Sequence, residues 1–217
     1  MPAKKSAQKR ETLIEAYLDH LMDEGKPPAS VRKFCRGLGI TEKAFYGHFA
    51  SFEAMEGGIW ASMIEDTVEV LESDEDYASY PARQKLGAFY YTFLETALDQ
   101  RSYLLLRFPG IQLVNPPVYL QRFQKAFNEF AKPLLAEAKD SKEVASRGRL
   151  NQAYPGLLYA QFLFVIDFWL KDESDGFERT DALVEKSTSL AFDLVGAQVL
   201  DSALDFVRFM AGEKGVA

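Results

Sequence analysis

Apolar residues recur at three- and four-residue spacing over most of the chain, which is the pattern of helices with one buried face. Between Glu11 and Met22 the stripe consists of Leu13, Ile14, Tyr17, Leu18 and Leu21. No segment shows the two-residue alternation that is typical of a half-buried strand. The pattern therefore predicts an all-α fold.

Three helices are predicted within the first fifty residues. Gly25-Lys26-Pro27-Pro28 ends the first, and Ser30 is placed to cap the second. Gly39 can supply the positive φ of a sharp turn, and Thr41 can cap a third, very short helix. A short helix, a glycine turn and a second short helix form a helix-turn-helix, the arrangement that presents its last helix to DNA.

The remaining helices are longer. Ser51 caps a fourth helix, and Pro133 predicts a kink or break near Ala131 in a later one. We expect residues 1–50 to form a helix-turn-helix domain, 51–72 to form the connecting helix, and 73–217 to form a helical bundle. The predicted helices of this bundle run through 86–98, 119–139, from about 149 to 170, and 181–210.

The segment Leu157–Leu170 is apolar on nearly every face. Its 14 residues are too few for a membrane span, which needs about 20. We expect protein to bury it on both sides, with a second copy of the chain as the simplest cover. Asp167 within it must face solvent, a partner cation or a ligand cavity, and a structural pairing is favoured.

Composition and charge narrow the function classes. The 217 residues are 47% hydrophobic, which is enough for a sizeable core. The net charge is −7, but residues 1–50 hold nine Lys or Arg against six Asp or Glu, so this head carries +3 and the rest −10. A basic head on an acidic body suits a module that contacts phosphate.

Cysteine and histidine are scarce. Cys35 is the single cysteine, so no intrachain disulfide is possible, and we expect it to be a small core residue. With two histidines there is little to hold a structural zinc ion, so neither a metal nor a cofactor is expected. The basic N-terminus is not followed by an apolar signal-peptide core, because Glu11, Glu15 and Asp19 interrupt it, and we expect a cytoplasmic protein.

The first sixty residues carry a resemblance to a known family. Gly39 stands at a turn glycine, Ile40-Thr41 at a Val-Ser or Val-Thr pair, and Tyr46-Gly47-His48-Phe49 at a Tyr-x-His-Phe ending. Phe34-Cys35 stands where an aliphatic-alanine pair is usual. In this order the features resemble the TetR family of transcriptional repressors, in detail over residues 11–60.

The resemblance implies a set of DNA contacts. It places Thr41, Tyr46 and His48 at phosphates, and Glu42, Lys43 and Ala44 towards the base edges of the major groove. For Tyr46 and His48 the alternative is core packing and a helix C-terminal charge. Arg32 and Lys33 of the preceding helix complete the candidate set.

One departure weakens the DNA-binding interpretation. The family usually opens its fourth helix with Ser-Lys-Glu, whereas this chain has Ser51-Phe52-Glu53. An aromatic ring therefore replaces a lysine that would meet a phosphate, and one contact is expected to be missing.

The resemblance also implies a homodimer whose last two helices form a four-helix bundle with those of the partner. Small residues in the last helix would allow close approach: Ala191, Gly196, Ala197 and Ala203. Aromatic residues of the body could line a pocket for a small apolar effector, or could equally be plain core. The candidate ligand residues are Phe89, Tyr90, Phe93, Arg107, Phe123, Tyr159 and Phe162.

We therefore expect a homodimeric, TetR-like regulator that binds double-stranded DNA, responds to a small apolar effector and does not span a membrane. The alternative is a TetR-fold protein that binds a lipid or isoprenoid and has lost DNA binding. An enzyme is not expected, because the sequence has no glycine-rich phosphate loop and no Gly-x-Ser-x-Gly nucleophile motif.

Overall fold

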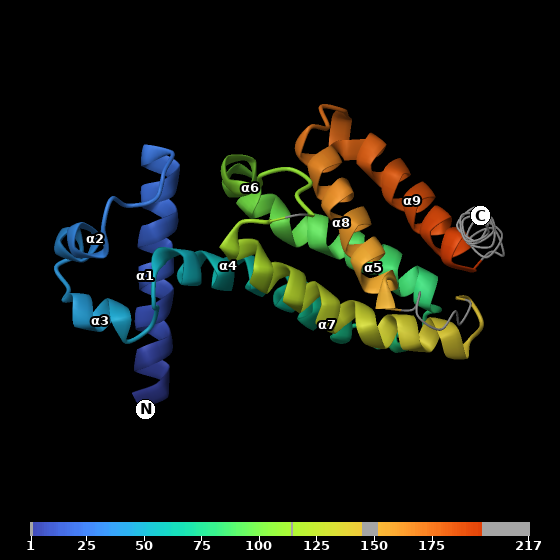
Figure 1. The fold of residues 1–217 in the computed structure, drawn as a ribbon, viewed down its shortest axis with the longest axis horizontal. Coiled ribbons are helices and arrows are strands. Elements are labelled where there is room, and N and C mark those ends of the chain that lie inside the picture. The colour runs from blue at the N-terminus through green and yellow to red at the C-terminus, as the bar shows by residue number, and fades with distance from the viewer. Residues whose placement is uncertain (1, 114, 145–151, 197–217) are drawn as a thin grey trace, which may run out of the picture. The chain divides into compact units, whose positions relative to one another are not determined.

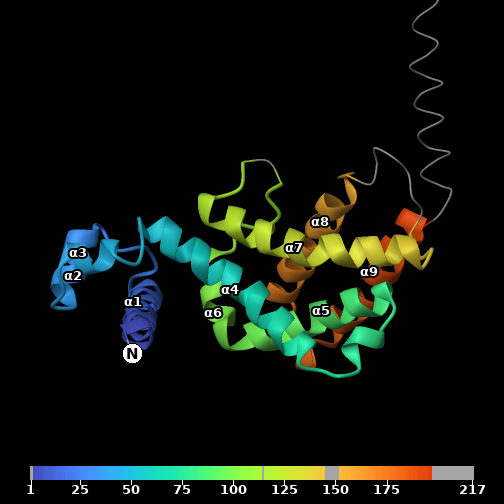
Figure 2. The same cartoon turned by 90° about the horizontal axis from the view of Figure 1, so that it is seen from below.

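The computed structural model describes residues 2–113, 115–144 and 152–196. Within these ranges all regular elements are helices (Figure 1 and Figure 2). The all-α prediction is confirmed. The chain forms two compact units, Met1–Glu69 with Phe93–Phe127 and Val70–Thr92 with Asn128–Ala217.

The first unit begins with the three predicted helices. They are α1 (Pro2–Glu24), α2 (Val31–Gly37) and α3 (Glu42–Tyr46), followed by the start of α4 (Phe52–Glu72). The unit also contains a 3-10 turn at Leu98–Gln100 and the short helix α6 (Arg101–Arg107), where the sequence predicted only an apolar connection. Tyr103 and Leu104 on one face of α6 are buried, which explains why this short segment is helical.

Side-chain caps fix the starts of α2, α3 and α4. The backbone N–H of Lys33 donates to Ser30 Oγ at 3.2 Å, and that of Ala44 donates to Thr41 Oγ1 at 3.2 Å. Ser51 Oγ accepts from Ala54 N–H at 3.1 Å. Gly39 has φ of 67°, the left-handed conformation expected at the turn. All three caps and the glycine turn are as predicted from the sequence.

The core of α1, α2 and α3 is built from their apolar stripes. Tyr17 and Leu21 of α1 are fully buried, as is Phe45 of α3. Cys35 is a free thiol and only 1% exposed, which confirms its assignment to the core. The helix-turn-helix is thus anchored from inside by large apolar side chains.

The second unit contains α8 (Tyr154–Leu170) and α9 (Glu178–Gly196), which lie side by side (Figure 1). Among the described residues it also contains the end of α4, parts of α5 (Ala82–Ala97) and α7 (Val118–Asp140), and the 3-10 turns Tyr77–Ser79 and Asp175–Phe177. Asp167 accepts from Lys171 Nζ at 2.6 Å, which confirms the predicted structural pairing. One helix is predicted to begin near residue 149, and the last is predicted to end at residue 210. Both positions lie outside the described residues.

Of the kink or break predicted near Ala131, the break is wrong, because α7 continues through Pro133 to Asp140. Proline has no backbone N–H, so one hydrogen bond of the helix is lost. This loss ends a helix most readily where water cannot replace the bond. Pro133 and the residue four positions earlier, Glu129, are both exposed. The lost bond therefore falls on the solvent side, while buried Ala131, Leu134 and Leu135 hold the helix against the core.

A buried carboxylate organises the start of α9. Asp172 is 5% exposed and accepts four hydrogen bonds, from the backbone N–H and the hydroxyl of both Ser174 and Thr180, at 2.6 to 2.9 Å. The hydrogen bond from Thr180 and the others from Ser174 outweigh desolvation and hold the pKa of Asp172 well below its ordinary value. The charged form is therefore part of the folded structure.

We expect the contribution of Asp172 to stability to be lost in acid. Because the pKa is lower in the folded than in the unfolded chain, its contribution is present above the unfolded value of about 3.9 and disappears as the pH falls through the folded one. In urea unfolding, the gap between wild type and Asp172→Asn should therefore narrow from pH 7 to pH 3. For the exposed neighbour Asp175, the Asp175→Asn gap should stay constant; a constant gap for Asp172→Asn would contradict the assignment.

Candidate nucleic-acid interface

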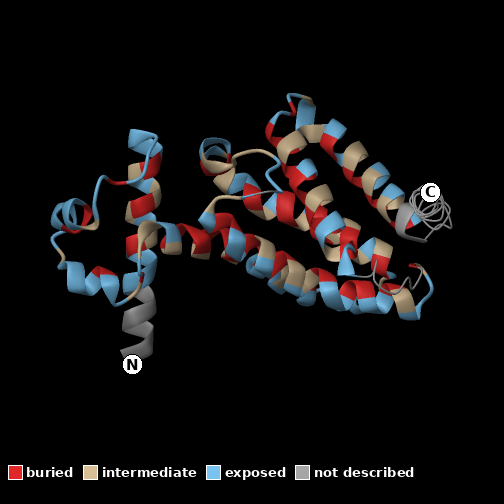
Figure 3. Cartoon of the chain, in the orientation of Figure 1, coloured by how far each residue is buried: buried red, intermediate tan, exposed pale blue. Residues whose placement is uncertain are grey.

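The surface of α3 is almost entirely open to solvent. Thr41, Glu42, Lys43 and Ala44 are exposed, whereas Phe45 is fully buried and anchors the helix (Figure 3). Tyr46 is 54% exposed, so its ring is not a core residue. His48 is half-buried. The six candidate contact residues of this segment thus lie on one short element that is free to meet a partner.

Ala44 and His48 also share a shallow groove with the N-terminal part of α1. This groove has a volume of about 450 Å³ and is lined by Lys9, Leu13 and Ile40 as well. Lys9 is exposed beside it. A positive charge from α1 therefore lies on the same surface as two of the candidate contacts from α3 and the turn that follows it.

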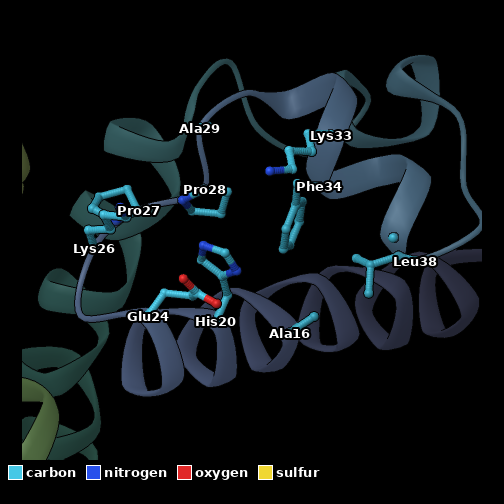
Figure 4. A pocket seen from close by; sticks show the side chains of 11 residues that line it. Ala16, His20, Glu24, Lys26, Pro27, Pro28, Ala29, Lys33, Phe34 and Leu38 are labelled. Atoms are coloured by element: carbon cyan, nitrogen blue, oxygen red, sulfur yellow. The ribbon is translucent and has the colours of Figure 1, made fainter.

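Arg32 and Lys33 are exposed at the start of α2. Lys33 borders a second groove, of about 630 Å³, between α1 and α2. Figure 4 shows Phe34 extending from α2 towards α1, with Lys33 beside it and His20 and Glu24 on the α1 side. Both cations are accessible, and their DNA contacts remain predictions.

Phe52, the departure from the family pattern, packs within a cluster of aromatic rings. Its ring stacks on Tyr17 at 5.4 Å with an interplanar angle of 16°. Phe34 and Phe45 each meet it edge to face with centroids 5.3 Å away. The ring that replaces a phosphate-binding lysine therefore joins the start of α4 to all three helices before it.

Restoring the lysine should cost stability. Each aromatic pair contributes about 0.5–1.5 kcal/mol, so Phe52→Lys is expected to lower the free energy of unfolding by about 2 kcal/mol. Urea unfolding measures this, with Phe52→Leu as the control that keeps an apolar side chain and should lose less. Equal stability of Phe52→Lys and wild type would contradict the packing role.

A buried carboxylate in the first unit joins three helices, because it lies on α4 and binds residues of α1 and α6. Glu56 of α4 is 1% exposed. Arg107 of α6 donates to it twice, from Nε to Oε1 at 2.6 Å and from Nη2 to Oε2 at 2.9 Å. The hydroxyls of Tyr17 (α1) and Tyr103 (α6) donate at 3.3 and 3.2 Å. We call these four residues the Glu56 cluster.

The two tyrosine hydroxyls and the Arg107 guanidinium of the cluster keep their protons. Burial, together with the Glu56 carboxylate, raises the pKa of the Tyr17 and Tyr103 hydroxyls well above their ordinary range, so both remain donors. The hydrogen bond to Glu56 raises the pKa of Arg107 as well. The carboxylate thus meets four donors and one full positive charge, and α1 is tied through α4 to α6.

This cluster was not predicted from the sequence, although Arg107 is one of the candidate ligand residues. The one available signal was an acidic residue beside Met55 on the apolar stripe of α4. Its partners are 39, 47 and 51 positions away in the chain, beyond the reach of a local pattern. The ligand role of Arg107 remains a prediction.

The other candidate ligand residues are buried in two places. In the first unit the rings of Phe93 and Phe123 lie 6.1 Å apart. In the second unit Phe162 stacks on Tyr90 at 5.5 Å and meets Phe89 edge to face at 5.4 Å. Tyr159 is buried as well, at 3% exposure. The seven residues are therefore divided between the two units.

Two further surveys cover only the described part of the chain. No helix there has both the length and the apolarity needed to cross a membrane. No group of three or more His, Cys, Asp and Glu side chains is placed there to hold a metal ion.

Comparison with known structures places the fold. A TetR-family transcription regulator from Shewanella sp. PV-4 aligns with a TM-score of 0.62 at 14% identity, over 86% of this chain and 97% of the other. The fatty acid degradation regulator FadR of Bacillus halodurans aligns at 0.61 and 15% identity, over 84% and 97%. A tetR-family regulatory protein from Rhodococcus RHA1 aligns at 0.51 and 13%, over 87% and 97%. These likenesses show a shared fold.

The family assignment comes from the sequence. A comparison with curated proteins finds no match. The family model of the tetracyclin repressor-like C-terminal domain matches residues 85–210, which is more than half of the chain. The chain therefore belongs to the TetR family of transcriptional regulators.

Proposed function

We propose that this protein binds double-stranded DNA as a homodimer and that a small apolar effector controls the binding. The observation that carries the proposal is the exposed surface of α3, held on a capped helix-turn-helix that Tyr17, Leu21 and Phe45 pack from inside. Phe45 packs α3 into the head, whereas Thr41, Lys43 and Tyr46 are exposed and are left to meet a partner. A short helix of this kind fits the major groove.

Binding to DNA can be tested with the promoter region beside the protein's own gene. Gel-shift titrations at 50 and 200 mM salt should give a specific complex that weakens as salt rises, because lysine and arginine contacts release counterions from phosphates. Six to ten such contacts would weaken binding by about 10³ to 10⁵ between these salt concentrations. Absence of a specific complex at 50 mM would count against the proposal.

Dimerisation is supported by apolar side chains of α8 and α9 that are exposed among the residues the structure describes. Leu157 and Phe164 of α8 are 52% and 43% exposed, and their seven-residue spacing places them on one face. Leu190 of the neighbouring α9 is 57% exposed. These three side chains are the ones that the expected second copy of the chain would bury. We propose that α8 and α9 of that copy pack against them.

A charge on this face should separate the subunits. We expect Phe164→Glu to convert a dimer into a monomer in analytical ultracentrifugation, because an unpaired carboxylate would be buried at the interface. The matched control is Leu105→Glu, an exposed apolar position on α6 of the first unit that should leave the dimer intact. A monomeric wild type, or a dimer that persists in Phe164→Glu, would contradict this interface.

Effector control is supported by buried polar atoms in the second unit. Among the described residues, the Tyr90 hydroxyl and Gln161 Oε1 are buried without a hydrogen-bond partner. Such atoms cost about 1–3 kcal/mol each when left unsatisfied. We propose that a largely apolar effector with a polar group binds among Tyr90, Phe89 and Phe162 and satisfies one of them.

The alternative, a lipid-binding protein without DNA affinity, was suggested by Phe52. Its ring has a packing role that does not require the loss of DNA binding, and the solved neighbours are named as regulators. The comparisons therefore do not favour this alternative. A purified protein that carries a stoichiometric lipid and forms no complex in the gel shift would restore it.

A further inference from the structure

The first unit contains a groove for which the roles above name no ligand, although Tyr46 at its edge is also a candidate DNA contact. Its volume is about 550 Å³, within the range of about 300–1,000 Å³ that is typical of small-molecule sites. It is bordered by the 27–31 segment, the end of α3 and the starts of α4 and α7. The aromatic side chains that line it are Tyr17, Tyr46, Phe52 and Tyr119.

Arg107 at this groove has donor capacity left over. Its Nε and Nη2 atoms bind Glu56, and its guanidinium lies 5.1 Å from the centre of the Tyr119 ring. A guanidinium has five N–H donors, of which these two bonds use two. The Nη1 group makes no hydrogen bond with any residue that the structure describes, and the side chain is 21% exposed. A ligand oxygen can therefore reach a donor here.

The charges of the lining favour a neutral ligand. Arg107 and Glu56 neutralise each other, and Glu53 at the exposed start of α4 adds a negative charge. No lysine or histidine lines the groove, so an anion has little to attract it. The Arg107 guanidinium already covers the face of the Tyr119 ring, where a cation could otherwise bind. Its positive charge would repel a cationic ligand.

We propose that this groove binds a neutral aromatic molecule that carries a carbonyl oxygen. The carbonyl accepts from Arg107 Nη1, and the aromatic part packs against Phe52 and Tyr119. This site is separate from the effector site proposed above, whose residues Tyr90 and Gln161 belong to the second unit. It is a second ligand site, and it does not depend on DNA binding.

Benzophenone tests the proposal, because it is a neutral aromatic ketone and cross-links to nearby C–H bonds on irradiation. Full-length wild-type protein should be labelled on peptides that contain residues 46–53 or 117–119. Val118→Trp, which fills one wall of the groove, should lower this labelling by about tenfold, equivalent to ~1.4 kcal/mol. Val70→Trp is the matched control at another exposed valine and should leave it unchanged.

A competition experiment tests the carbonyl without any variant. Fluorenone should suppress benzophenone labelling of the groove peptides, whereas fluorene, which has the same rings and no carbonyl, should do so much less. Equal suppression by both would overturn the assignment to Arg107. Labelling that is unchanged in Val118→Trp would overturn the groove site. Labelling that falls only on α5 and α8 peptides would also overturn it, and would support the effector site instead.

Discussion

Replacing Glu56 with alanine is expected to lower the free energy of unfolding by about 3–5 kcal/mol. This is the usual effect of removing one partner of a buried ion pair, because the other charge loses its compensation. Here the change would also leave the Tyr17 and Tyr103 hydroxyls without their acceptor. Urea unfolding followed by circular dichroism measures the loss directly.

The matched control for this experiment is Glu53→Ala. Glu53 lies three residues earlier on the same helix and is exposed, so its removal should change stability by about 1 kcal/mol or less, the size of a helix-terminus charge effect. Similar losses for Glu53→Ala and Glu56→Ala would show that the cluster contributes nothing specific.

Replacing Ala44 with glutamate should abolish DNA binding without unfolding the protein. Ala44 is exposed on α3, and its backbone N–H, which Thr41 caps, is unaffected by the side chain. A second carboxylate beside Glu42 would enter the major groove between the two phosphate backbones, and like-charge juxtaposition costs several kcal/mol. The affinity should fall by about 100-fold or more, equivalent to ~2.7 kcal/mol, in fluorescence anisotropy with labelled operator DNA.

Ala136→Glu provides the same change in charge and size on α7, at an exposed position of the second unit. It should leave DNA affinity within about twofold, since surface changes away from the interface have small effects. Equal loss of affinity in both variants would indicate a general charge effect, and unchanged affinity in Ala44→Glu would remove α3 from the interface.

The head of this protein could be predicted from its sequence because its signals are local. Ser30, Thr41 and Ser51 cap helices within three residues of themselves, and Gly39 determines one turn by its own backbone conformation. The exposure of Tyr46 agrees with the DNA contact that the family resemblance implies, and not with the alternative of core packing. Each of these features depends on neighbours along the chain.

The Glu56 cluster could not be predicted in this way. It assembles side chains from α1, α4 and α6, and nothing near Glu56 in the sequence distinguishes a buried, paired carboxylate from an exposed one. The helix α6 was missed for a related reason, since seven residues hold a helical shape only when packed. The packing of Phe52 was likewise visible only once Tyr17, Phe34 and Phe45 were placed around it.

The most direct test of the central claim is the mass of the complex between the purified protein and the promoter DNA beside its gene. Light scattering after size-exclusion chromatography at 50 mM salt gives this mass. We predict two chains on one duplex, with half-sites about 34–36 Å apart so that both copies of α3 enter successive major grooves. A protein that elutes apart from the DNA at this salt concentration, or that binds it as a single chain, would contradict the account.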